Sequence, residues 1–148
     1  MIDGPTDIAI DSKNNIYIAD NGNNRIRIIN QNGQINTFAG TGADGYDEDG
    51  TVATNCKLSH PYGLFIDQKD NVYYSDNGNS IIRKIDKNKV VSTIAGTVGK
   101  PGYNGDGGLA TKCEIRNPGG IAIDRSGNLL IADFGNNVVR MTTNKQKK

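Results

Sequence analysis

Histidine, tryptophan, cysteine and net charge are all scarce in this sequence. Its 148 residues include one histidine, no tryptophan and two cysteines, and 17 basic against 16 acidic side chains leave a net charge of +1. So balanced a chain has no overall field to steer it toward nucleic acid or an anionic membrane. One histidine cannot supply the about three protein ligands of a catalytic zinc site, and neither Gly-x-Ser-x-Gly nor His-Glu-x-x-His occurs. A membrane or nucleic-acid partner is therefore not expected, and catalysis has little support.

Long apolar runs are missing as well, which argues against a membrane-spanning helix. The 35% hydrophobic content is enough for the core of one domain. Because Pro5 already belongs to the first of the repeats below, we expect no leader peptide, and an intracellular location is slightly favoured. Cys56 and Cys113 both follow Ala-Thr-x in equivalent repeat positions, too far apart to bridge, so we interpret them as small buried residues.

The most informative pattern is a threefold repeat. A Pro-x-x-x-x-Ile-Asp segment begins at Pro5, at Pro61 and at Pro118, at intervals of 56 residues (5 to 61) and 57 residues (61 to 118). The register persists through a second apolar segment that ends in aspartate and a third that carries an Ile-Arg or Val-Arg pair. A fixed period of this size indicates one supersecondary unit repeated along the chain.

Each repeat consists of short runs rich in Ile, Val, Leu and Tyr, separated by Asn, Gly, Asp and Ser, which is typical of strands rather than helices. Strands are predicted at 7–10, 16–19, 25–29 and 35–39, then at 64–66, 72–75, 81–85 and 90–95, and finally at 121–123, 129–132 and 138–141. The predicted fold is all-β, a partial β-propeller of three four-stranded antiparallel blades whose third blade lacks its last strand. Blades occupy about 4–40, 61–96 and 118–142, with insert 1 at 41–60, insert 2 at 97–117 and a basic tail at 143–148.

The third repeat carries a family resemblance. Its segments Pro-x-Gly-Ile-Ala-Ile-Asp, Asn-Leu-Leu-Ile-Ala-Asp and Gly-Asn-Asn-x-Val-Arg, within 118–140, resemble the NHL repeat of β-propellers. Insert 2, with Thr93-Ile-Ala-Gly-Thr97 before it and Gly102-Tyr-Asn-Gly-Asp-Gly107 within it, is similar to the long-insert form of that repeat. The resemblance implies a ring of about six blades, or in some members five, and this chain supplies fewer than three complete blades.

Two sets of repeated polar residues are interpreted as structural. The aspartates begin Asp-x-Gly-Asn loops, which could cage a hard cation or a sugar but better fit a turn that accepts loop N–H groups once per blade. The arginines lie on the third strand of each repeat and are expected to pair with carboxylates of the same or a neighbouring blade. These positions are Asp20, Asp76 and Asp133, and Arg27, Arg83 and Arg140.

The inserts supply the ligand-binding candidates. In an antiparallel meander, the loops after the second and fourth strands lie on the same face of the blade. The Asp-x-Gly-Asn loops and both inserts should therefore gather around one mouth of the central channel of the propeller. The candidates are Tyr46, Asp47, Asp49, Tyr103, Asn104 and Asp106. Calcium at Asp44, Asp47 and Asp49 is a weak possibility, because an EF-hand alignment places Gly45 at the first ligand position and insert 2 is less acidic. We therefore expect no cofactor.

The sequence best fits a non-catalytic module that binds a protein partner or a small ligand through this face. The family resemblance leaves two alternatives, a metal-dependent propeller enzyme of the lyase or hydrolase class and an RNA-binding NHL propeller. Blades one and three would each expose a sheet face, so we expect the remaining blades to come either from a longer parent chain, somewhat favoured, or from a second copy in a head-to-tail dimer.

Overall fold

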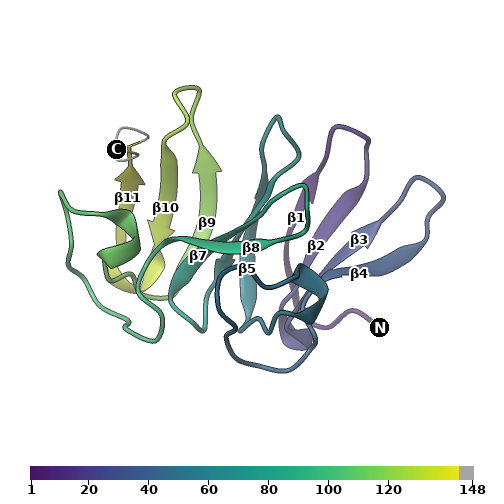
Figure 1. Ribbon diagram of the computed structural model, residues 1–148, viewed down its shortest axis with the longest axis horizontal. Coiled ribbons are helices and arrows are strands. Elements are labelled where there is room, and N and C mark those ends of the chain that lie inside the picture. The colour runs from purple at the N-terminus through teal and green to yellow at the C-terminus, as the bar shows by residue number, and fades with distance from the viewer. Residues whose placement is uncertain (144–148) are drawn as a thin grey trace.

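The computed structural model describes residues 1–143, and they form three antiparallel sheets that stand side by side (Figure 1). Most of the basic tail predicted at 143–148 lies outside the described residues. Blade 1 contains β1 (Pro5–Ile10), β2 (Ile16–Asp20), β3 (Arg25–Ile29) and β4 (Ile35–Ala39). Blade 2 contains β5 (Pro61–Ile66), β6 (Val72–Asp76), β7 (Ile81–Ile85) and β8 (Val91–Ala95). Blade 3 contains β9 (Pro118–Ile123), β10 (Leu129–Asp133) and β11 (Val138–Thr142), and has no fourth strand within residues 1–143.

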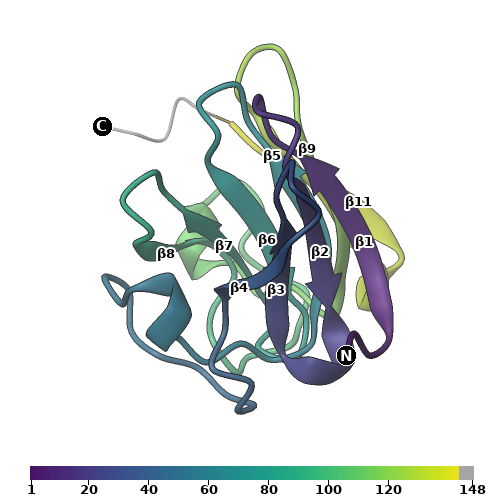
Figure 2. The same cartoon turned by 90° about the vertical axis from the view of Figure 1, so that its right-hand side faces the viewer.

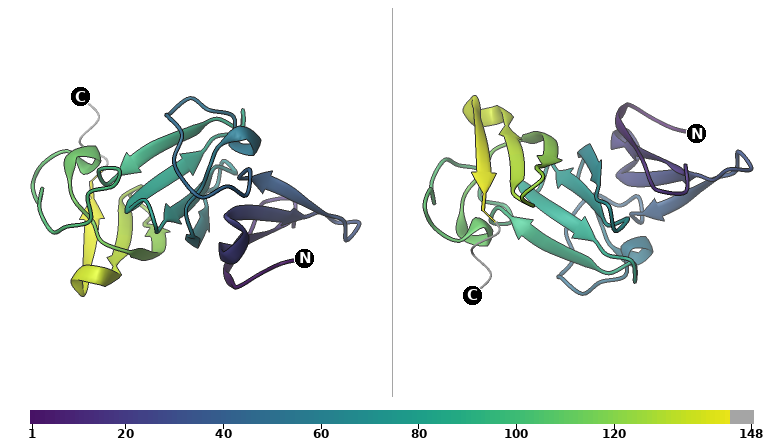
Figure 3. Two further views of the ribbon diagram at one scale, coloured as in Figure 1. Left: turned by 90° about the horizontal axis from the view of Figure 1, so that it is seen from below. Right: turned by 90° about the horizontal axis from the view of Figure 1, so that it is seen from above.

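The sheets are arranged as neighbouring propeller blades, confirming the predicted fold. Seen from below and from above, the three sheets diverge from the side on which their first strands lie (Figure 3). The first strands contact one another in the order β1, β5, β9. They approach closely, because a Cβ added at Gly63 of β5 would lie 2.5 Å from the carbonyl oxygen of Gly119 in β9. Across the other junction, the Thr6 hydroxyl donates to the Tyr62 carbonyl at 2.8 Å.

The turn between the first and second strand is built around an aspartate in every blade. In blade 1 the Asp11 carboxylate accepts the backbone N–H groups of Lys13 and Asn15 and the Asn15 side-chain amide, at 2.8–2.9 Å. Asp67 and Asp124 make the same three bonds in their blades. These donors lower the pKa of Asp11 although burial opposes them. The local sequence therefore supplies the bonds that close this turn. In blade 1 the turn also contacts blade 2, because the Ser12 N–H and hydroxyl donate to the Asp70 carboxylate at 2.9 and 2.7 Å.

Apolar side chains are buried mainly between blades. Tyr17, Ile26 and Phe38 of blade 1 pack with Leu64 and Tyr74 of blade 2 in one cluster. A second cluster joins the opposite face of blade 2 to blade 3. The faces without a neighbouring blade remain open: Ile8 and Ile10 of blade 1 are 63% and 57% exposed, whereas Leu64, at the position of Ile8, is 6% exposed. Stacking, rather than any single sheet, therefore creates the core.

The strand boundaries differ from the prediction where pairing becomes irregular. The first strand of each blade begins at proline rather than at the predicted residues 7, 64 and 121, because that proline pairs with the terminal aspartate of the second strand across a register shift. Alternation is interrupted there, so the pattern misses the extension. β8 starts at Val91 rather than Val90, which instead forms an isolated bridge with Val52 of insert 1.

Four single turns of 3-10 helix within residues 1–143 were not predicted: η1 (Asn21–Asn23), η2 (Ala53–Asn55), η3 (Ala110–Lys112) and η4 (Phe134–Asn136). Two lie in the Asp-x-Gly-Asn loops and two in the Ala-Thr-x-Cys segments of the inserts. Among residues 1–143 there is no helix long and apolar enough to cross a membrane.

Candidate functional site

The Asp-x-Gly-Asn loops anchor the chain that leads into each blade. Asp76 is fully buried, and its carboxylate accepts the Ser59 N–H at 2.7 Å and the Asn79 side-chain amide at 2.9 Å. Asn79 also donates to the carbonyl of Gly45 in insert 1, at 2.8 Å. Burial is the largest influence on Asp76 and raises its pKa to about 7.

The same contacts recur in the other two blades. Asp20 accepts the Asp3 N–H, and Asp133 accepts the Arg116 N–H, both at 2.8 Å. Asn23 and Asn136 repeat the amide contact of Asn79. Each loop thus joins a second strand to the segment that precedes the first strand of the same blade.

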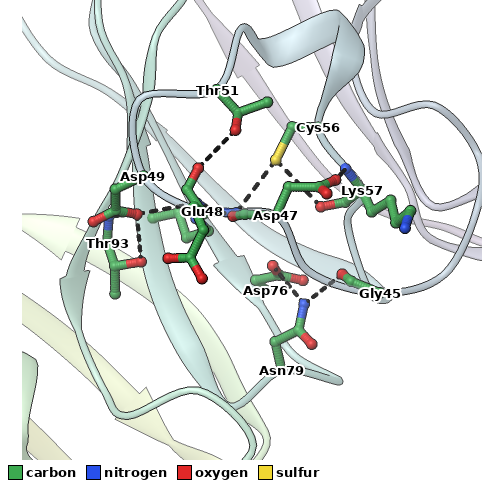
Figure 4. A network of polar contacts seen from close by, with 11 residues as sticks. Gly45, Asp47, Glu48, Asp49, Thr51, Cys56, Lys57, Asp76, Asn79 and Thr93 are labelled. Atoms are coloured by element: carbon green, nitrogen blue, oxygen red, sulfur yellow. Dashed lines mark hydrogen bonds and ion pairs between the residues drawn. The ribbon is translucent and has the colours of Figure 1, made fainter.

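Insert 1 folds over Arg83 of the following blade. Figure 4 shows Asp47, Asp49 and Cys56 of this insert, with Asp49 beside Thr93. The buried guanidinium donates to the Asp47 carbonyl at 2.9 Å, to Asp49 Oδ1 at 3.1 Å and to Cys56 Sγ at 3.3 Å. The Tyr46 ring covers it at 4.8 Å from the ring centroid. Figure 2 shows the insert beside the outer strand β8 rather than over the inner strands.

Insert 2 makes an equivalent clamp on blade 3. Arg140 donates to the carbonyls of Asn104, at 2.8 Å, and Glu114, at 2.7 Å, and pairs with the Asp106 carboxylate. The Tyr103 ring lies 5.4 Å from its guanidinium. The six ligand-binding candidates are therefore divided into two sets, each in contact with its own arginine.

Arg27 occupies the same repeat position but has no insert over it in the described chain. Its closest carboxylate is Asp20, at 3.5 Å, and its Nε donates to the Asn36 carbonyl at 3.4 Å. The arginine of blade 1 thus keeps its contacts within its own blade, and it lacks the tyrosine ring, the backbone carbonyl and the carboxylate that insert 1 supplies to Arg83.

The acidic residues of insert 1 point to different protein donors. Asp49 accepts both the N–H and the hydroxyl of Thr93 at 2.9 Å, in addition to Arg83. Asp47 accepts the Lys57 N–H at 2.7 Å. Within residues 1–143 no three His, Cys, Asp or Glu side chains gather in a geometry that could hold a metal ion.

The two cysteines are free thiols in the clamps, as predicted from their spacing. Cys56 is buried next to Arg83, and burial raises the pKa of its thiol. Cys113 is 5% exposed in insert 2.

A cavity at the inner ends of the blades, called the mouth cavity below, is a candidate binding site. It has a volume of about 450 Å³ and lies where the loops after the second strands meet the beginnings of β5 and β9. Two aromatic side chains line it, Tyr62 at 45% exposure and Phe134 at 75%. The remaining lining comes from His60, the amides Asn21, Asn77 and Asn117, and Gly119, Gly120 and Ala132.

His60, which lines this cavity, has a left-handed backbone conformation. It has φ of 50°, and the corresponding Gly4 and Asn117 have φ of 52° and 46°. Glycine adopts this left-handed conformation freely, and asparagine and histidine are among the other residues that adopt it most often. The His60 N–H donates to the Asn24 side chain of blade 1 at 2.9 Å.

Phe134 marks a departure from the repeat. Asn21 donates to the Pro61 carbonyl at 3.2 Å, and Asn77 donates to the Pro118 carbonyl at 3.0 Å, so each amide joins one blade to the next. Blade 3 has Phe134 at this position, and its exposed ring lines the cavity instead.

Comparison with known proteins agrees with this architecture. The family model of the NHL repeat matches residues 3–29. NHL repeat-containing protein 2 of Bos taurus is 32% identical over 136 residues, covering 85% of this chain. The chain belongs to the NHL-repeat family. The match to NHL repeat-containing protein 2 covers 18% of that protein's length.

Two further relatives extend the comparison of NHL blades. Protein SUPPRESSOR OF QUENCHING 1, chloroplastic, of Arabidopsis thaliana is 34% identical over 135 residues, 84% of this chain and 12% of that protein. A crystal structure of a Bacteroides thetaiotaomicron protein of unknown function superimposes with a TM-score of 0.78 at 25% identity, covering 86% of this chain and 32% of the other. The NHL chain therefore spans less than a fifth of the length of either named relative.

Sequence reasoning missed the mouth cavity of this NHL chain. None of the six insert candidates lines it. The signal was present in the repeat itself, because Phe134 replaces an asparagine that the first two blades share and His60 stands where the other blades have Gly4 and Asn117. Departures from the repeat, rather than its repeated residues, indicate this site.

Proposed function

We propose that this NHL segment is a non-catalytic binding module whose mouth cavity accepts an uncharged ligand group with an apolar face and several hydroxyl or amide groups. The observation that carries the proposal is the pairing of exposed Tyr62 and Phe134 in one cavity of about 450 Å³ that is otherwise lined by amides and glycines. Aromatic rings offer a flat apolar surface, and side-chain amides both donate and accept hydrogen bonds.

The chemistry of the cavity favours binding over catalysis. His60 is its one imidazole, and no carboxylate is among the described residues that line it. General acid and base catalysis requires positioned titratable groups, and a charged ligand requires an opposite charge. An uncharged group that combines a ring-stacking face with hydroxyls, as in a sugar or a polar peptide loop, requires neither a titratable group nor an opposite charge in the cavity.

The proposal can be tested with phenyl β-glucoside, an uncharged probe with one ring and several hydroxyls. Titration of isotope-labelled protein, followed by NMR, should shift the resonances of Tyr62, Asn77, Asn117 and Phe134 in a saturable way. Phe134→Asn restores the residue found in blades 1 and 2, so the fold should be kept while binding weakens at least tenfold.

A tyrosine on insert 2 provides the matched control. Tyr103 is 57% exposed, comparable with Tyr62, but contacts Arg140 outside the cavity. Tyr103→Ala should leave probe binding unchanged. Shifts centred on Tyr103 and Asp106 would instead place the ligand on the insert, and the absence of any saturable shift would contradict binding of this chemistry at the mouth.

A further inference from the structure

The junction between blades 1 and 2 is closed at the end of the sheets opposite the mouth cavity. Ser12, in the turn after β1, donates to the carboxylate of Asp70, in the turn after β5. Behind this contact, Ala9, Tyr17 and Ile28 of blade 1 pack into the apolar cluster that the two blades share. Side chains therefore fill this junction from the core to the turns.

The junction between blades 2 and 3 has other residues at the closing positions. Gln68 stands at the position of Ser12, and Gly127 stands at the position of Asp70. Glycine has no side chain that could accept the closing hydrogen bonds. A cavity of about 470 Å³ lies here, lined by the turns after β5 and β9 and by the strands beside them.

Blade 2 lines this cavity with a row of three side chains on one face of its sheet. Phe65 of β5 pairs with Tyr73 of β6, which in turn pairs with Lys84 of β7. The two rings meet edge to face at 6.2 Å between centroids, and Lys84 Nζ lies 5.7 Å from the centroid of the Tyr73 ring. In blade 1 the first and third positions of this row are Ala9 and Ile28. Blade 2 therefore adds a ring and a positive charge where blade 1 has only small or apolar packing residues.

Three cationic side chains from two blades line the cavity, Lys69, Lys84 and Arg125. None of them forms an ion pair with a carboxylate in the part of the chain that the structure describes. The two carboxylates in the lining, Asp67 and Asp124, each accept three hydrogen bonds within their own turn. Three positive charges against two negative ones leave a net charge of +1. The cavity therefore suits a ligand with one negative charge.

We propose that this cavity between the turns of blades 2 and 3, which is separate from the mouth cavity, binds a small organic anion with one carboxylate on a flat apolar ring. The ring packs between Phe65 and Ile123, and the carboxylate accepts hydrogen bonds from Lys84 and Arg125. A phosphate ester, with about two negative charges at neutral pH, matches the net charge of the cavity less well.

The test uses the full 148-residue chain and 2-naphthoate, a fluorescent carboxylate with a flat ring system. The protein has no tryptophan, so the emission of the probe can be followed directly and binding measured by fluorescence anisotropy. Saturable binding is expected. 2-Naphthamide has nearly the same shape without the charge, so it should bind at least tenfold more weakly. Equal affinity for the two probes would overturn the proposal.

Two substitutions supply residues that blade 1 already has at the same positions, so the fold should be kept. Lys84→Ile introduces the equivalent of Ile28, and Arg125→Ser introduces the equivalent of Ser12. Binding of 2-naphthoate should weaken at least tenfold in Lys84→Ile and at least threefold in Arg125→Ser, because each variant loses a charged hydrogen-bond donor. Lys87→Ile is the matched control, since it removes the same charge from the turn after β7, outside the cavity lining. It should leave binding unchanged.

NMR of isotope-labelled protein locates the probe. The amides of Phe65, Arg125 and Gly127 should shift in a saturable way as 2-naphthoate is added. Shifts centred on Tyr62 and Phe134 would place the probe in the mouth cavity and overturn the proposal. An equal loss of binding in Lys87→Ile, which would indicate general charge attraction, or no saturable binding at all would overturn it as well.

Discussion

Replacing the two arginines Arg83 and Arg27 with methionine should have very different effects, although both occupy the same repeat position. Methionine keeps much of the length of the side chain and removes the charge and the donors. Arg83 is fully buried and donates to the Asp47 carbonyl and the Asp49 carboxylate, whereas Arg27 has one ion pair at 3.5 Å. The difference between the two variants therefore measures the insert clamp.

The magnitude follows from these contacts. Hydrogen bonds from a charged donor contribute about 1.5 to 3 kcal/mol each, and Arg83 makes two to oxygen in addition to its contact with the Tyr46 ring. Removing a buried charge returns part of its desolvation free energy, and Arg83 Nε lacks a hydrogen-bond partner among the described residues. We expect Arg83→Met to lower the free energy of unfolding by about 2 to 4 kcal/mol, and Arg27→Met by about 0 to 1 kcal/mol.

Urea unfolding followed by far-ultraviolet circular dichroism measures both values. Hydrogen exchange adds a local measurement, because three amides bond across the junction between insert 1 and blade 2. Gly50 and Ala53 of the insert donate to the carbonyls of Val91 and Lys89, and Thr93 of β8 donates to Asp49 of the insert. In Arg83→Met these amides should exchange faster, and in Arg27→Met they should not. Equal destabilisation by the two variants, or unchanged exchange of the insert amides in Arg83→Met, would refute the clamp.

Three further predictions concern the loops and inserts. Asp76→Ala should lower the free energy of unfolding by about 1 to 3 kcal/mol, because buried donors lose their acceptor; an unchanged thermal midpoint would contradict the structural role of the loop. Burial raises the pKa of Asp76 to about 7, so the stability that its protonated form contributes is present below about pH 4 and is lost as the pH rises through 7. The free energy of unfolding of the wild type should therefore fall between these pH values, and Asp76→Asn should flatten that fall. Parallel pH profiles for the two proteins would contradict this role of Asp76. Calcium and EDTA should leave the melting temperature unchanged, because Asp49 is already paired with Arg83 and Thr93; a rise with calcium would indicate a bound ion.

Much of the fold could be predicted because its strands follow local patterns. β3, β4 and β7 have the predicted bounds, since alternation and flanking turns define both ends. The beginnings of β1, β5 and β9 could not be predicted, because a register irregularity interrupts alternation where proline pairs with a distant aspartate. That pairing depends on the sheet, not on neighbouring residues.

Where the inserts pack also depends on tertiary contacts and could not be predicted from the local sequence. The acids of insert 1 form an obvious cluster in the sequence, but nothing local shows that Arg83, more than thirty residues away, is the partner of Asp49. The mouth cavity was hidden for a different reason. Its aromatic residue Phe134 lies in a loop that otherwise matches the repeat. Comparing the repeats by their shared residues overlooks a position at which a single repeat differs.

The position of the inserts also determines which stretch of sequence can be copied as an intact part. By sequence pattern the repeat runs from proline to glycine, as in residues 5–40, but a copy of that stretch would carry an arginine without its clamp. A copy of residues 41–95 would carry insert 1, Arg83 and the strand that the insert borders, so every contact of the clamp would be inherited together. Gene duplication that lengthens such a propeller is therefore expected to succeed with crossover points just after β4 and β8, where a blade ends and the next insert begins. Each added unit then contains both the insert and the arginine that it contacts.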